Sequence, residues 1–110
     1  MKEIKAIIRL HKLSDVVDAL HAVKGVPGLT VSEVKGFGRS PETSLTEKRA
    51  EVFPDYAKRA KLEIVIPDAM LDEIVRIITK TACTGREGDG MIFVSSVEDA
   101  IRIRTALPIT

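Results

Sequence analysis

The strongest constraint on the fold is the order in which strand and helix signals follow one another. Four segments carry the apolar pattern of strands, and two carry an apolar stripe at helical spacing. The expected strands cover residues 2–10, 29–35, 61–66 and 91–94, and the expected helices cover residues 15–24 and a segment that begins at Pro67. This order predicts a ferredoxin-like βαββαβ fold of the α+β class, with one antiparallel sheet and both helices on one face.

Local signals place the ends of the elements. Ser14 is the expected N-cap of the first helix, and Gly25 stands where a helix C-terminus favours a left-handed residue. Ser95 or Ser96 is expected to cap one short turn over residues 97–100. A last strand should then follow at residues 101–104.

Composition indicates one soluble domain over residues 1–110, with 45% hydrophobic and 30% charged residues. A net charge of +1 weighs against nucleic acid and membrane surfaces as direct partners. The chain has a single cysteine, Cys83, and the lack of a second one to pair with fits a reducing cytoplasm. We interpret Cys83 as a small apolar side chain. Apolar neighbours such as Ile7 and Ile8 place apolar residues on both faces of the sheet, so we expect a homo-oligomer.

A glycine-rich segment and an arginine pair predict a site for a phosphate-bearing ligand. Glycines at positions 85, 88 and 90 let successive N–H groups converge on an anion. Arg102 and Arg104 stand two residues apart, so on a strand both guanidinium groups would share one face.

The connection between the second and third strands is much longer than a hairpin requires. Residues 36–60 carry many charges and little apolar periodicity. Long loops without structure of their own are uncommon in compact domains and are usually functional or disordered. We therefore expect a flexible element that reaches a partner or folds over a ligand.

These features together resemble the PII family of nitrogen-regulatory signal-transduction proteins. The resemblance covers nearly the whole chain, and its matching blocks are residues 30–39, 61–67, 84–94 and 101–105. It implies a homotrimer that binds ATP or ADP, with AMP as a further candidate, in clefts between subunits. Residues 36–60 would be the family's T-loop, which docks into a transporter or an enzyme, so a membrane is reached only through a partner. The resemblance implies no enzyme activity.

The resemblance also implies which residues bind the nucleotide. The expected ligand-binding residues are Thr30, Gly38, Arg39, Val65, Gly88, Asp89, Gly90, Met91, Arg102 and Arg104. In the family, the glycine–aspartate loop and the arginine pair hold phosphates. Residues that match Thr30 and Val65 lie beside the adenine, and those that match Gly38 and Arg39 close over the nucleotide.

Several positions depart from the family pattern. Met91 replaces the usual lysine, which leaves the preference among ATP, ADP and AMP open. Ser40 replaces a glutamine that helps to organise Mg-ATP and 2-oxoglutarate, which weighs against both Mg²⁺ and 2-oxoglutarate as ligands. Arg49 replaces a usual glycine, and Val52 replaces the tyrosine that is uridylylated, so that modification cannot occur here. The chain is interpreted as a divergent paralogue.

Other functions fit the sequence less well. Acylphosphatase chemistry on the same fold needs an asparagine to position water, and the chain has none. The four aromatic residues are too few for RNA stacking platforms. His11 and His21 lack a recognisable ligand spacing, so no metal site is assigned, although a metal sensor stays open. A sensor of another small anion such as bicarbonate, not tied to nitrogen control, is the remaining alternative.

Overall fold

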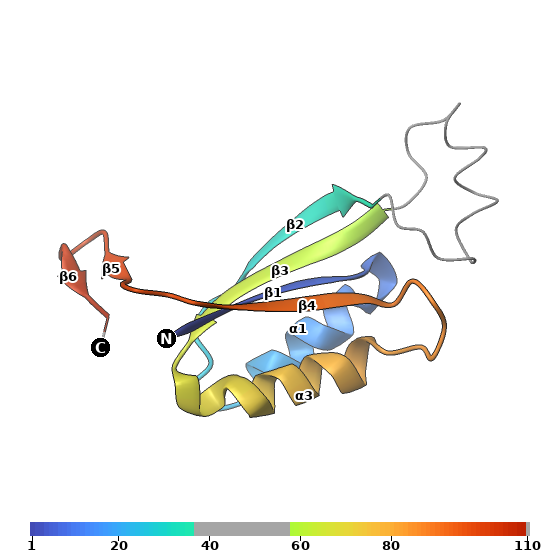
Figure 1. Ribbon diagram of the computed structural model, residues 1–110, viewed down its shortest axis with the longest axis horizontal. Helices are drawn as coiled ribbons and strands as arrows, with labels where there is room; N and C mark the ends of the chain where they lie inside the picture. Colours follow the sequence, from blue (N-terminus) through green and yellow to red (C-terminus); the bar gives the residue numbers. More distant parts are fainter. Residues whose placement is uncertain (37–57, 110) are drawn as a thin grey trace.

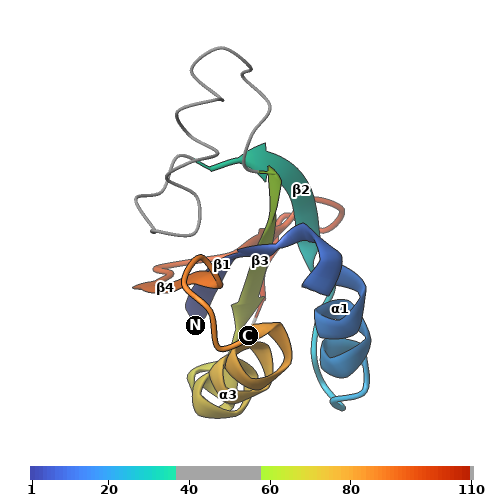
Figure 2. The same ribbon diagram turned by 90° about the vertical axis from the view of Figure 1, so that its right-hand side faces the viewer.

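The computed structural model describes residues 1–36 and 58–109 and confirms the expected ferredoxin-like fold (Figure 1). Its main sheet is antiparallel throughout and has the strand order β2-β3-β1-β4. The strands are β1 (Lys2–Arg9), β2 (Thr30–Lys35), β3 (Lys58–Ile66) and β4 (Gly90–Ser96), and the helices are α1 (Leu13–His21) and α3 (Leu71–Ala82). Both helices cover the same face of this sheet (Figure 2).

The core lies between that face and the helices. Alternate residues of β1 and β3 point inward because successive strand side chains face opposite ways, and the register pairs Ile4 with Ile64 and Ala6 with Leu62. The buried residues are Ile4, Ala6, Ile8, Ala60, Leu62, Ile64 and Ile66 from the sheet and Val16, Leu20, Ile74, Ile78 and Ala82 from the helices. The core therefore uses one face of each element, as the apolar spacing predicts.

Within residues 1–36 and 58–109, no helix covers the opposite face of the sheet, and this face retains an apolar patch. The register of β1 and β4 places Ile7 opposite Met91 and Lys5 opposite Phe93, on the face away from the helices. Met91 is 62% exposed and Phe93 is 51% exposed. Large apolar side chains gathered on an open sheet face are typical of a surface that another chain covers.

Helix ends differ from the sequence prediction. A short 3₁₀ helix precedes each main helix: η1 (Leu10–Lys12) before α1 and η2 (Asp68–Met70) before α3. Ser14 therefore lies inside α1 and is not its N-cap; Lys12 holds that position without a side-chain hydrogen bond. The 3₁₀ turn supplies the entry into the helix instead. Gly25 does adopt the expected left-handed backbone, with φ of 90°.

The C-terminal prediction is wrong in detail. Residues 97–100 form no helical turn, and Ser95 and Ser96 belong to β4. After them, β5 (Ile101–Arg102) pairs only with β6 (Leu107–Pro108) among the described strands.

Arg104 accordingly lies in the turn between β5 and β6 and does not share a strand face with Arg102. The amide of Ala106 closes this turn by donating to the carbonyl of Arg102 at 2.7 Å, and Ala106 has a φ of 57°. A strand without further neighbours gains little from continuing, which explains why the hairpin is short.

None of the helices within residues 1–36 and 58–109 is long and apolar enough to cross a membrane.

Candidate functional site

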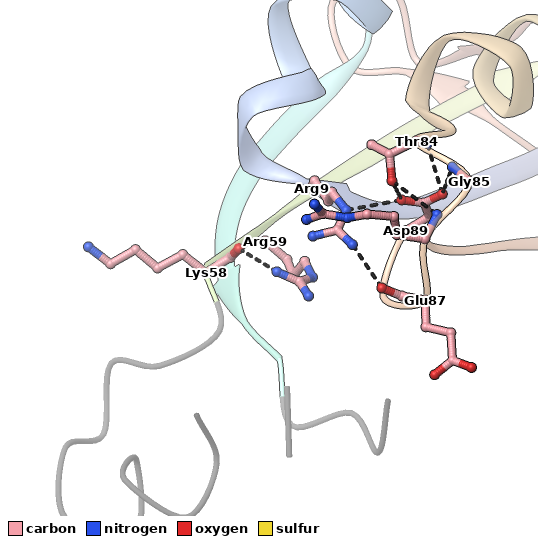
Figure 3. Close-up of polar contacts among 8 residues, drawn as sticks. Arg9, Lys58, Arg59, Thr84, Gly85, Glu87 and Asp89 are labelled. Atoms are coloured by element: carbon pink, nitrogen blue, oxygen red, sulfur yellow. Dashed lines mark hydrogen bonds and ion pairs between the residues drawn. The ribbon is translucent and has the colours of Figure 1, made fainter. Parts of the chain in front are cut away.

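The loop between α3 and β4 is closed by the side chain of Asp89 (Figure 3). One carboxylate oxygen, Oδ2, accepts hydrogen bonds from the backbone amides of Thr84 at 2.8 Å and Gly85 at 3.0 Å. The other, Oδ1, accepts from the hydroxyl of Thr84 and from Nε of Arg9 at 3.0 Å. Asp89 thus ties the end of the loop to its beginning and to β1.

Arg9 contacts the loop at a second point. Its Nη2 donates to the carbonyl oxygen of Glu87 at 2.8 Å, while its Nε forms the ion pair with Asp89. The side chain of Arg9 is only 11% exposed and that of Asp89 is 24% exposed. Partial burial strengthens both charge-assisted contacts relative to a surface ion pair.

These donors also set the protonation state of Asp89. The Thr84 hydroxyl contributes most, and the Arg9 guanidinium and the two amides add to it, so the pKa of Asp89 lies well below its usual range. Burial acts in the opposite direction and is outweighed. Asp89 is therefore ionised at neutral pH.

Glycine is required at specific points of this loop. Gly85, Gly88 and Gly90 all have positive φ values, of 84°, 91° and 112°. A Cβ on Gly90 would also stand 1.8 Å from the carbonyl oxygen of Ile7. At position 90 only glycine can adopt the positive φ and also leave room for the carbonyl oxygen of Ile7.

Basic residues gather at the same end of the sheet. The register places Arg9 opposite Arg59 and Lys35 opposite Lys58, at the ends of three neighbouring strands. Like charges directly opposite one another on a sheet are destabilising. By strand alternation Arg9 and Arg59 lie on the face away from the helices, whereas Lys35 and Lys58 lie on the face of Ala60 and Leu62. Asp89 offsets the repulsion between Arg9 and Arg59, and these two cations favour a further anion beside the loop.

A second group of expected site residues lies at the other end of the sheet. Thr30 and Val65 line a cavity of about 460 Å³, together with Glu63, Gly28 and Ile109. Ile109 directly follows the β5–β6 hairpin. Its backbone amide donates a hydrogen bond to the carbonyl oxygen of Ala100 at 2.8 Å, which closes the base of the hairpin.

The structure therefore divides the expected site residues into two groups (Figure 1). Gly88, Asp89, Gly90 and Met91 are consecutive at the loop end, whereas Thr30, Val65, Arg102 and Arg104 lie toward the hairpin end. The seven residues of β4 alone separate the two ends by about 20 Å. Gly38 and Arg39 lie outside the described residues.

Sequence reasoning placed Thr84 in the glycine-rich segment without assigning it a role, and it missed Arg9 and Arg59 as residues of the loop end. A signal for Arg9 was present, because it stands one residue before the end of the first predicted strand. The ferredoxin-like order places that strand next to the one that follows the glycine loop. The contact itself joins residues 80 positions apart and is visible only in the fold.

Within the part of the chain that the structure describes, no group of three or more His, Cys, Asp or Glu side chains could hold a metal ion.

Comparisons with known proteins place this chain in a family. The family model "Nitrogen regulatory protein P-II" matches residues 1–106. The chain is 50% identical over 105 residues to nitrogen regulatory protein P-II 1 of Escherichia coli K12, covering 96% of this chain and 93% of that protein. It is 47% identical over 105 residues to nitrogen regulatory protein P-II of Rhodospirillum rubrum, with the same coverage.

The fold and these matches define a signal-transduction protein that is not an enzyme. The chain belongs to the family of P-II nitrogen regulatory proteins.

Proposed function

We propose that this protein is a trimer that binds ATP or ADP between neighbouring subunits, with AMP as a further candidate ligand, and regulates a target transporter or enzyme through residues 36–60. The separation of the two groups of site residues supports the intersubunit site. A ligand the size of a nucleotide cannot contact Gly88 and Arg102 of one chain when β4 lies between them. A neighbouring copy supplies the second group.

The chemistry of the two ends is complementary in this assembly. The glycine loop and the cations around Arg9 and Arg59 form the phosphate side of the cleft, since backbone N–H groups and guanidinium groups both suit phosphate oxygens. The cavity beside Thr30 and Val65 forms the adenine side, because it combines apolar walls with a hydroxyl and the Glu63 carboxylate. Arg102 and Arg104 reach the phosphates from that second subunit.

The helix-free sheet face supports the trimer. Ile7, Met91 and Phe93 lie on that face, and their burial against other copies would remove apolar surface from water. In this assembly the open face is the common interface, and the nucleotide clefts lie where the two ends of adjacent chains meet.

A complementation experiment tests the proposal. Gly88→Asp adds a negative charge in the loop, at a φ that Asp tolerates better than most residues. The double variant Arg102→Ala/Arg104→Ala removes the other half of the site. Each variant alone should bind ATP weakly by calorimetric titration, as should each variant refolded alone as a control.

Refolding the two variants together should restore wild-type affinity in roughly a quarter of the sites, because each mixed trimer holds one cleft built from two intact halves. A site contained within one chain would gain nothing from mixing, and that result would refute the intersubunit arrangement. Failure of the wild-type protein to bind any adenine nucleotide would refute the proposed ligand.

A further inference from the structure

We propose that Arg9 is a positioning residue for the phosphate side of the cleft: it holds the glycine loop in its binding shape and neutralises Asp89 before the nucleotide arrives. This inference rests on the proposed function for its effect on nucleotide affinity. Its structural part concerns the loop alone.

The hydrogen-bonding capacity of the Asp89 carboxylate is used within the protein. Both of its oxygens accept hydrogen bonds from within the protein: Oδ2 from two amides, and Oδ1 from the Thr84 hydroxyl and Arg9. A carboxylate that accepts all of these hydrogen bonds fixes the shape of the loop. It has no donor for a polyphosphate, and its negative charge repels the polyphosphate.

The negative charge of Asp89 needs a compensating cation. A negative side chain in an anion-binding loop weakens anion binding unless a cation lies beside it. Arg9 is that cation, since its Nε lies 3.0 Å from Asp89 Oδ1. Removing the guanidinium would leave an ionised Asp89 next to the phosphates, and the penalty would grow with the charge of the ligand.

The guanidinium of Arg9 spans two points of the loop. It contacts both Asp89 and the carbonyl oxygen of Glu87, so one side chain fixes both points. The planar guanidinium presents its donors in a fixed fork, whereas a lysine ammonium is a point charge on a flexible stem. Arg9 is the last residue of β1, whose backbone pairs with β3 at this point. The loop is thereby anchored to the sheet.

The test begins without nucleotide. Amide hydrogen exchange at Thr84 and Gly85 should be about tenfold faster in Arg9→Met than in wild type, because the acceptor for both amides is released. Arg76→Met removes the same charge from the exposed side of α3 and should leave both amides unchanged. Unchanged exchange in Arg9→Met would overturn the loop-holding role, whatever the nucleotide results.

Binding is then measured by titration with ATP and with AMP. Arg9→Met should weaken ATP about 10–100-fold and AMP less, and Arg9→Lys should recover part of the loss for ATP by restoring the charge. In the double variant Arg9→Met/Asp89→Asn, the loss should be smaller than the sum of the two single losses, because no unpaired carboxylate remains.

Two further results would overturn the proposal. Equal weakening of ATP and AMP in Arg9→Met, with no rescue by lysine, would show that Arg9 does not act through charge. Faster exchange throughout the β1–β3 ladder would make Arg9 a residue of general stability. Absence of nucleotide binding by the wild-type protein would refute the proposed function instead, and the exchange measurements would still decide whether Arg9 holds the loop.

Discussion

The backbone of Gly90 lies directly against the carbonyl oxygen of Ile7, so closely that a Cβ built on Gly90 would stand 1.8 Å from that oxygen. This contact joins the first residue of β4 to β1 at the point where the glycine loop ends. It also brings Asp89 within reach of Arg9. The shape of the loop therefore depends on one glycine that has both a left-handed backbone and no room for a side chain.

A series of glycine substitutions separates these two requirements. Gly90→Ala should lower the free energy of unfolding by about 3 kcal/mol or more, since it adds a clash with backbone to a φ of 112°. Gly25→Ala has the positive φ but no atom within 4 Å of the new Cβ, and should cost about 1 kcal/mol.

Gly28→Ala has neither feature and should change stability by less than about 0.5 kcal/mol. Denaturant unfolding of the three variants measures the series. Equal losses in Gly90→Ala and Gly25→Ala would show that the strands separate easily enough to relieve the clash.

The Asp89 network predicts a specific pH dependence of stability. The pKa of Asp89 is lower in the folded protein than its ordinary value of 3.8, so its contribution is present above that value and is lost as pH falls toward the folded pKa. Asp89→Asn should therefore be about 1–3 kcal/mol less stable than wild type at pH 7. The difference should narrow as the pH falls below about 4.

Urea unfolding of both proteins between about pH 3 and pH 7 measures this difference. Asp68→Asn is a useful comparison, because the pKa of Asp68 is also lowered, chiefly by the N-terminal ammonium 3.0 Å away, but Asp68 lies outside the loop. A gap between wild type and Asp89→Asn that stays constant with pH would mean that the network does not depend on the Asp89 charge.

The sequence predicted the elements of the main sheet and their inward faces well because the signals for them are local. Alternation in residues 2–10 fixes which side chains of β1 face the core, and Ile4 and Ile8 are buried as that alternation requires. The position of Met91 and Ile7 on the open face follows from the same alternation once the strands are paired.

Features set by contacts distant in sequence were not predicted. The partnership of Arg9 with Asp89 needs β1 and β4 to lie side by side. The β5–β6 hairpin was missed because its second strand has only two residues and ends in Pro108, too short to give a periodic signal. Arg104 therefore lies in the turn of this hairpin and not on the predicted strand.

The apolar patch on the open face predicts how the protein assembles. Wild type should have about three times the 12.0 kDa chain mass by light scattering. Phe93→Glu should dissociate it, because Phe93 is 51% exposed on the face without helices and a charge there would be buried in the interface. Val94→Glu, on the same strand but the opposite face and 45% exposed, is the matched control and should keep the assembly. Dissociation by both variants or by neither would place the interface elsewhere.

The last prediction concerns Met91, which immediately follows the glycine loop and lies opposite Ile7. Met91→Lys adds a positive charge at the phosphate side of the proposed cleft and should tighten ATP more than AMP. Met91→Gln has a similar length without the charge, so it reports the loss of the thioether alone. The gain from lysine should shrink at higher salt, since exposed charges are screened over about 10 Å at 0.1 M ionic strength.

Titration of all three proteins with ATP and AMP at two salt concentrations distinguishes the outcomes. Equal effects of lysine and glutamine would mean that Met91 packs against the neighbouring chain, as its place beside Ile7 and Phe93 allows. Arg59, which lies opposite Arg9 at that end, would then supply the charge that the nucleotide needs. Equal tightening of ATP and AMP by lysine would instead show that position 91 does not face the outer phosphates.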